Sequence, residues 1–319
     1  MMRRMPHAIE ATTVAGHAGV MLHAPEAEVA ATFLPGLGML GCSLRHRGEE
    51  LLALRDGVPA YAATGSTSGI PLLYPWANRL GSDRFELLGR TVAIAGEPPL
   101  VRREEHDLAI HGLLGAHPGW RVDAEAAGDD GARLVASLDF GAHPELMERF
   151  PFPHRVELAV ELAHATLRVV TRVEATEPVA VPVSFGYHPY FALPGVPRAE
   201  WELELPSRAR LVLDENQLPT GERVPEAADR APIGDRLFDD GYDGLVPASS
   251  FGLAGGGRRL VLVLEAGYPC AQVFVPPGDE YACLEPMTAP TNALVEHAAL
   301  PLARPGTPYE ATWSLTVDS

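Results

Sequence analysis

Three short segments of the chain carry side chains that could transfer protons and hold hydroxyl groups. Residues 75–79 read Pro-Trp-Ala-Asn-Arg, residues 186–191 read Gly-Tyr-His-Pro-Tyr-Phe, and residues 283–286 read Cys-Leu-Glu-Pro. A histidine that faces a carboxylate forms an acid/base pair for proton transfer near neutral pH. An asparagine and an arginine beside them supply hydrogen-bond donors in fixed geometry. This combination suggests acid/base chemistry on a sugar without a cofactor.

The histidine and the glutamate are interpreted as catalytic because of their surroundings. His188 lies among aromatic residues, and Pro189 favours an extended backbone at the histidine. A packed core histidine is the alternative, but an aromatic setting is typical of sites that bind sugar faces. Glu285 follows an apolar run and precedes a proline, where a carboxylate is either a strand-end surface group or a site residue. Paired with His188, it becomes the natural general base.

Four further polar residues are candidates for substrate contacts. Asn78 and Arg79 suit hydroxyl and hemiacetal oxygens, although an arginine paired with a surface carboxylate is the alternative. His111 precedes a glycine that permits close approach of a ligand. Its spacing from His106 is not the helical spacing of a two-histidine metal site, so we expect no metal. Asp243 ends an acidic run that forms either a solvated turn or a contact with sugar hydroxyls.

Composition and charge exclude several classes of function. The 319 residues, 46% of them apolar, can build one large all-β domain or two ordinary domains. The net charge of −17 opposes binding to nucleic acid or to an anionic membrane surface. All 25 basic residues are arginines, which rules out a Schiff-base lysine, a pyridoxal-phosphate lysine and a P-loop lysine.

Cysteine content and the length of apolar segments indicate in which cellular compartment the protein is expected. The 3 cysteines form no C-x-x-C motif, so neither a disulfide framework nor a structural zinc site is expected. No continuous apolar segment follows Arg3 and Arg4, which argues against a signal peptide. The longest apolar run, residues 260–264, is too short to span a membrane. We therefore expect a cytoplasmic protein.

Frequent glycines and prolines, together with a polar/apolar alternation of period two, predict an all-β fold. The 31 glycines and 30 prolines break the chain into short segments and argue against long helices. Alternating segments predict a hairpin at 155–162 and 166–173, strands at 201–205 and 309–317, and a strand–turn–strand unit at 253–264. The best helical candidate is 144–147, and 227–240 is predicted to be a polar loop. We expect an antiparallel sandwich or barrel that forms a single domain over residues 1–319.

Six motifs along the chain occur in a recognisable order. They are Asn78-Arg79, His111-Gly112, residues 188–191, Pro219-Thr220-Gly221, Gly241-Tyr242-Asp243 and Glu285. This order resembles the aldose 1-epimerase (galactose mutarotase) family, and the motifs spread over nearly the whole chain.

The resemblance implies a fold, an activity and a set of residue roles. The fold would be a large antiparallel β-sandwich of the supersandwich type, with the sugar in an open cleft across one sheet. His188 would be the general acid and Glu285 the general base. Arg79, His111 and Asp243 would contact the sugar, with Asn78 a weaker candidate. The partner would be a small-molecule sugar, with no metal or cofactor, and the protein would be a monomer or a homodimer.

The predicted activity interconverts the α and β anomers of a free aldose, and three alternatives remain open. A phosphosugar mutarotase would need an arginine cluster, and Arg79 and Arg84 are near each other in sequence. A glycoside hydrolase would need two carboxylates, for which Glu285 and Asp243 are candidates. A non-catalytic sugar-binding protein of the same fold is the third alternative.

Overall fold

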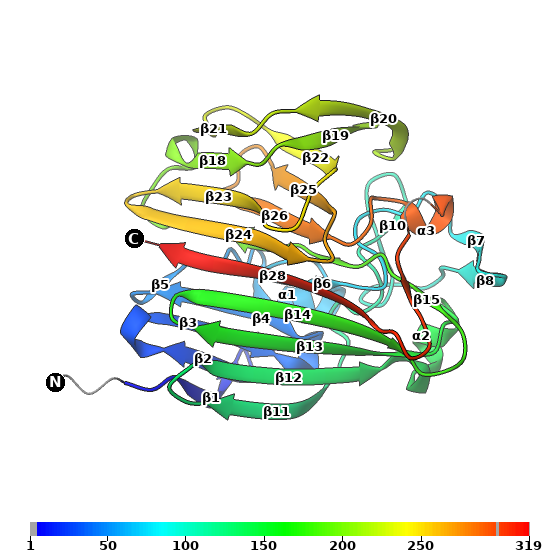
Figure 1. The fold of residues 1–319 in the computed structure, drawn as a ribbon, viewed down its shortest axis with the longest axis horizontal. Coiled ribbons are helices and arrows are strands. Elements are labelled where there is room, and N and C mark those ends of the chain that lie inside the picture. The colour runs from blue at the N-terminus through cyan, green and yellow to red at the C-terminus, as the bar shows by residue number, and fades with distance from the viewer. Residues whose placement is uncertain (1–4, 298–299, 319) are drawn as a thin grey trace.

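Antiparallel strands make up most of the chain, as the alternating segments predict. The computed structural model describes residues 5–297 and 300–318. Its largest sheet has nine strands in the order β11 (Arg121–Ala127), β12 (Ala132–Asp139), β13 (His154–Ala163), β14 (Thr166–Ala175), β28 (Tyr309–Asp318), β24 (Arg258–Ala266), β23 (Ser249–Gly255), β18 (Glu202–Leu205) and β21 (Asp229–Pro232). Figure 1 shows this sheet crossing the whole molecule.

Two further sheets complete the sandwich. The eight-stranded sheet runs β20 (Pro219–Glu226), β19 (Arg208–Leu213), β22 (Phe238–Asp243), β25 (Cys270–Val275), β26 (Ala282–Met287), β16 (Gly186–Tyr187) and β6 (Leu72–Leu73), with β17 (Tyr190–Phe191) also paired to β26. The five-stranded sheet runs β1 (Ala8–Val14), β2 (His17–Ala24), β3 (Val29–Leu34), β4 (Leu40–His46) and β5 (Glu49–Glu50). The fold is therefore the large antiparallel β-sandwich that the sequence predicts.

Short pairs and helices connect the sheets. The two-stranded pairs are β7 (Arg84–Leu87) with β8 (Arg90–Ala93), β9 (Arg102–Arg103) with β10 (Ala109–Ile110), and β15 (Val181–Pro182) with β27 (Leu302–Ala303). The helices are α1 (Gly57–Thr64), α2 (Pro144–Met147) and α3 (Ala293–Glu296). Within the described residues, no helix has the length and apolar character needed to cross a membrane.

The core lies between the sheets and follows from the alternation of the strands. In β13, Val156, Leu158 and Val160 are buried, while the intervening Arg155 and Glu157 are partly exposed. Side chains from the nine-, eight- and five-stranded sheets belong to one buried cluster. Each fully buried valine or leucine contributes about 1.5–3 kcal/mol, so this shared core fixes how the sheets face each other.

The predicted elements agree with the structure except at two places. The hairpin, the strand–turn–strand unit, the closing strand and the helix at 144–147 are confirmed. The prediction of a loop at 227–240 is wrong, because β21 and the start of β22 lie there. Strand β21 is the edge of its sheet and has no buried residue, so its sequence shows no apolar alternation. Helix α1 was not predicted, although Gly65 ends it in the left-handed conformation that glycine favours.

A tight bend at Gly112 brings the segment that carries His111 close to the segment that carries Arg79. Gly112 has φ +76°, and a Cβ at this position would overlap the backbone of Tyr74. The Tyr74 carbonyl also accepts hydrogen bonds from the N–H groups of Leu113 (2.6 Å) and Leu114 (3.2 Å). Only glycine fits this position, because both the conformation and the space exclude a side chain.

Gly112→Ala should therefore lower the free energy of unfolding by about 3 kcal/mol or more, through strain and overlap together. Gly89→Ala is the matched control, because Gly89 also has positive φ (+75°) but has no heavy atom within 4 Å of the added Cβ. The control should cost only about 1–2 kcal/mol. Urea denaturation of both variants measures the difference, and equal losses would contradict a packing role for Gly112.

Candidate active site

Strand pairing places His188 directly across from Glu285. Gly186 pairs with Met287, and Tyr190 pairs with Cys283, so the same register puts residue 188 opposite residue 285. Glu285 is paired on its other side with Gln272 of β25. Because cross-strand partners in a sheet point to the same face, His188, Glu285 and Gln272 form a row across it. The row explains how residues almost a hundred positions apart meet.

The histidine and the carboxylate are in contact and nearly buried. His188 Nε2 lies 3.3 Å from Glu285 Oε1, with 7% and 2% of the two side chains exposed. The imidazole stacks on the ring of Tyr190 at 4.5 Å with an interplanar angle of 7°. The edge of Phe274 contacts it at a centroid distance of 6.0 Å. Aromatic packing thus fixes the ring plane and keeps Nε2 directed at the carboxylate.

Burial shifts the pKa values of His188 and Glu285 in opposite directions. Desolvation, together with the positive charge of Arg102, lowers the pKa of His188 to about 3. Desolvation also raises the pKa of Glu285 well above 4.5, with Asp239 adding to the increase and Arg79 opposing it. Between these two pKa values the pair holds one proton, and the shifts place it on Glu285. A pair that shares one proton can donate at one atom and accept at the other.

Asn78 and Arg79 enter the same cavity from a separate segment. Arg79 bridges to Ile110, and the His111 N–H donates to the Asn78 carbonyl at 3.0 Å. Asn78 has φ +57°, a left-handed conformation that asparagine tolerates. Its side-chain Oδ1 accepts from the Arg79 N–H at 2.8 Å and from Arg79 Nη1 at 3.1 Å. Asn78 therefore orients Arg79.

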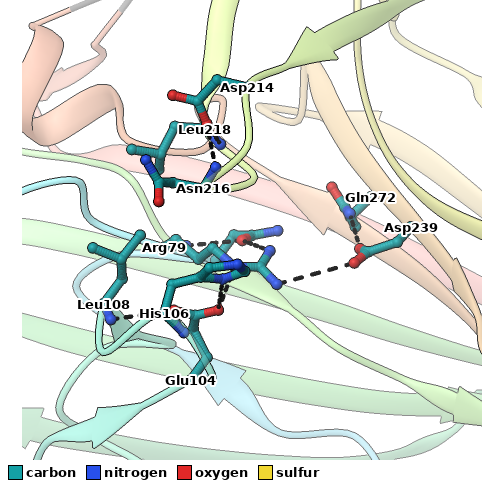
Figure 2. A network of polar contacts seen from close by, with 10 residues as sticks. Arg79, Glu104, His106, Leu108, Asp214, Asn216, Leu218, Asp239 and Gln272 are labelled. Atoms are coloured by element: carbon teal, nitrogen blue, oxygen red, sulfur yellow. Dashed lines mark hydrogen bonds and ion pairs between the residues drawn. The ribbon is translucent and has the colours of Figure 1, made fainter.

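Carboxylates on two sides hold the Arg79 guanidinium in place, as Figure 2 shows. Arg79 Nε donates to Glu104 Oε2 at 3.2 Å, and Nη2 lies 4.0 Å from Asp239 Oδ2. Burial raises the pKa of Glu104, but hydrogen bonds from His106, Leu108 and Arg79 outweigh this effect and keep the pKa below 4.5. Glu104 is therefore ionised at neutral pH and positions Arg79.

Glu104→Gln should raise KM about tenfold and change kcat little. The substitution replaces a charge-assisted hydrogen bond to Arg79 with a neutral one, which weakens the hold on the guanidinium. Glu105→Gln is the control, since Glu105 is exposed and adjacent in sequence. Steady-state kinetics measure both parameters, and an unchanged KM would show that Arg79 needs no such support.

His111 lines the cavity beside His188. The two imidazoles meet edge to face at a centroid distance of 5.3 Å. Burial lowers the pKa of His111 well below 6.5, and His188, Arg102 and Arg79 lower it further. His111 is thus neutral, and its Nδ1 is a buried atom with no hydrogen-bond partner among the described residues.

Asp243 lies away from the cavity that the other predicted residues share. Its carboxylate pairs with Arg223 Nε at 2.5 Å, and it does not line the cavity. Asp239, four residues earlier on the same face of β22, lines the cavity instead. A shift of four residues is about 13 Å along a strand, which explains why only one of the two aspartates is in reach. Asp239 Oδ1 accepts from Gln272 Nε2 at 2.6 Å.

The cavity has a volume of about 200 Å³ and unites five of the six predicted site residues. Those five are Asn78, Arg79, His111, His188 and Glu285. The cavity is also lined by residues that were not predicted as site residues, namely Arg55, Thr67, Arg102, Tyr190, Asp239, Gln272, Phe274 and Tyr281. The acidic run and the aromatic setting around residue 188 pointed to Asp239 and Tyr190, whereas no local pattern marked Arg55 or Arg102.

Two groups of histidine and glutamate among the described residues have atoms close enough to share an ion. In the group of His117, His143 and Glu145, the Gly119 N–H donates to His117 Nδ1 at 3.1 Å. The ring proton is then on Nε2, which faces Glu145 and so acts as a donor. In the group of Glu104, Glu105 and His106, Glu104 already accepts several hydrogen bonds. We assign a metal to neither group.

Comparison with known proteins gives consistent matches. Residues 42–316 match the family model described as aldose 1-epimerase. An uncharacterised protein of Escherichia coli K12, YphB, is 27% identical over 248 residues, which cover 74% of this chain and 77% of that protein.

Solved structures share the fold. A galactose mutarotase-like protein from Clostridium acetobutylicum has a TM-score of 0.85 at 18% identity, covering 98% of this chain and 99% of that one. A galactose mutarotase related enzyme from Lactobacillus acidophilus has a TM-score of 0.73 at 17% identity, covering 98% of each chain.

Proposed function

The chain belongs to the aldose 1-epimerase family, and from this premise we propose that it interconverts the α and β anomers of a reducing sugar. The observation that carries the proposal is the contact between His188 Nε2 and Glu285 Oε1 at 3.3 Å. The contact lies in a cavity lined by groups that can hold hydroxyls.

The reaction needs one proton acceptor and one proton donor. Once the shared proton has moved from Glu285 to His188, Glu285 takes the proton from the C1 hydroxyl, and His188 protonates the ring oxygen. The bond between C1 and the ring oxygen breaks, the aldehyde rotates about C1–C2, and the steps reverse on the other face. Each positioned acid or base typically contributes about 10²–10⁴-fold.

Polar groups around the pair are suited to orient the sugar. Arg79 offers guanidinium donors, and Gln272 and Asp239 together offer amide and carboxylate groups. The Tyr190 and Phe274 rings supply apolar faces beside His188. Fixing the ring oxygen near one member of the pair and the C1 hydroxyl near the other lowers the entropic part of the barrier.

The pH profile of kcat/KM should be bell-shaped, because activity requires one shared proton in the pair. The acid limb should lie near pH 3, where His188 takes up a second proton, rather than near the 6.5 of a free histidine. The alkaline limb should lie well above 4.5, because the pKa of Glu285 is raised and the pair loses its proton there. Initial rates from acid to mildly alkaline pH check this, with circular dichroism confirming the native fold. A flat profile would contradict the pairing.

The positions of Asp243 and Asp239 do not favour the glycoside hydrolase alternative. Asp243 was its second carboxylate, but it pairs with Arg223 outside the cavity. Asp239 does line the cavity, yet it is bonded to Gln272 and lies beside Arg79. Release of a reducing sugar from a nitrophenyl glycoside would be the sign of hydrolysis.

Polarimetry tests the proposal. Purified protein is added to freshly dissolved α-D-glucose, α-D-galactose and their 6-phosphates, and the rate of rotation change is compared with the uncatalysed rate. We expect acceleration with at least one sugar in proportion to protein concentration. No acceleration with any of them, together with measurable sugar binding, would favour a non-catalytic sugar-binding protein.

A further inference from the structure

Two arginines that line the cavity have no carboxylate partner among the described residues. Within the part of the chain that the structure describes, neither Arg55 nor Arg102 forms an ion pair. Arg55 Nη1 donates to the Thr67 carbonyl at 3.3 Å, and its guanidinium lies 5.7 Å from the centre of the Tyr190 ring. Arg102 Nη1 is buried and has no hydrogen-bond partner among the described residues. Arg79, by contrast, lies next to two carboxylates.

The surroundings of Arg102 make its charge costly. Burial lowers the pKa of Arg102, and the positive charge of Arg55 lowers it further. The groups that act in the opposite sense are the phenols of Tyr190 and Tyr61, which are uncharged at neutral pH. A partly desolvated guanidinium beside a second cation is unfavourable unless an anion compensates it. Arg102 forms no ion pair with a carboxylate of the described residues, and the carboxylate that acts on Arg55 is that of its chain neighbour Asp56.

Arg55 lies on one side of the acid/base pair, and Asp239 and Gln272 lie on the other. Across the sheet, β22 and β25 carry Asp239 and Gln272, and β26 carries Glu285. His188 follows between β16 and β17. The segment that leads to Arg55 lies beyond β17, because the Ala53 N–H donates to the Tyr190 carbonyl at 2.9 Å.

Arg102 joins this group from β9. It pairs with Ile110, the residue before His111, so its guanidinium belongs to the wall that also holds that histidine. The protein as a whole carries a charge of −17, which repels anions. A local pair of cations is what an anionic ligand would require to enter such a protein.

We propose that Arg55 and Arg102 bind an oxyanion carried by the sugar, so that the substrate is an aldose with a phosphoryl or carboxylate substituent. The inference rests on the proposed anomer interconversion and names its substrate class. Guanidinium groups are suited to both oxyanions, because their donors match them in a bidentate manner.

A bound oxyanion would also act on the acid/base pair. Arg102 and Arg55 both lower the pKa of His188, so an anion that neutralises them favours the protonated imidazole. The sugar would then promote transfer of the shared proton to His188 as it binds. This couples recognition of the substituent to the proton shared by His188 Nε2 and Glu285 Oε1, which lie 3.3 Å apart.

Binding of unreactive sugars tests the subsite apart from catalysis. Isothermal titration calorimetry compares 1,5-anhydro-D-glucitol, its 6-phosphate and its 6-carboxylate, none of which has a C1 hydroxyl, with inorganic phosphate as a fourth probe. We expect at least one anionic analogue to bind about ten- to a hundredfold more tightly than the neutral one. The two anionic arms show which substituent is preferred. Added salt should weaken only the anionic analogues.

Substitutions show which residues cause the preference for anionic analogues. Arg55→Gln and Arg102→Gln should each reduce it at least tenfold and leave binding of the neutral analogue unchanged, which also shows that the variants are folded. Arg103→Gln is the matched control, because Arg103 is the next residue on β9 but pairs with Asp83 at 2.7 Å. Equal binding of neutral and anionic analogues to the unaltered protein, or a preference that survives both substitutions, would overturn the inference.

The same sugars with a free C1 hydroxyl separate this inference from the proposed function. Acceleration of mutarotation without preference for an anionic sugar would overturn the oxyanion subsite and leave the proposed function standing. Preferential anion binding without mutarotation of any sugar would overturn the proposed function and leave the oxyanion subsite standing.

Discussion

Glu285→Gln should lower kcat for anomer interconversion by about 10²–10⁴-fold, the typical contribution of a positioned acid or base. The amide has nearly the same shape as the carboxylate and can still contact His188, but it cannot accept or release the proton. Because Glu285 is a buried group with a raised pKa, the neutral amide should also be tolerated by the fold. Polarimetry at saturating sugar gives the ratio of kcat values.

The control for this variant is Glu204→Gln. Glu204 is a glutamate of the nine-stranded sheet that pairs with Arg259 at 2.5 Å, and it does not line the cavity. It should keep the kcat of the unaltered protein. A Glu285→Gln variant with a native circular dichroism spectrum and undiminished kcat would remove Glu285 from the mechanism.

His188→Asn should lower kcat by a similar factor, about 10²–10⁴-fold, because the amide cannot exchange a proton with Glu285 or with the ring oxygen. The acid limb of the pH profile should disappear as well, since no imidazole is left at this site to take up the second proton. Loss of the stacking contact with Tyr190 should cost stability in addition. Activity and thermal unfolding are therefore measured together.

His164→Asn serves as the control, because His164 is exposed at the turn between β13 and β14 and has a positive φ that asparagine accepts. Its activity and pH profile should match those of the unaltered protein. If His188→Asn kept its acid limb, the limb would belong to another group.

The strands of the sandwich could be predicted because buried alternation leaves a direct trace in the sequence. The hairpin of β13 and β14 is an example, since every second residue faces the core. The edge strand β21 could not be predicted in this way, because both of its faces are partly or fully exposed. Pairing partners far apart in the chain, such as β14 with β28, also leave no local signal.

The site was predictable where chemistry and local context coincide. His188 is flanked by aromatic residues and a proline, and Glu285 follows an apolar run and precedes a proline, so both were identified. Asp239 and Asp243 lie in one acidic run on one face of β22, and only the register with β25 decides which of them reaches the cavity. Arg55 and Arg102 approach through tertiary contacts alone, which the sequence does not encode locally.

The most direct measurement of the central claim is exchange spectroscopy on the anomeric protons of a reducing sugar at equilibrium. We expect exchange cross-peaks between the α and β signals that grow with the concentration of the unaltered protein. These should vanish to the uncatalysed level with Glu285→Gln. Absence of enhanced exchange with neutral, phosphorylated and carboxylated aldoses alike, in conditions where the sugars bind, would contradict the account.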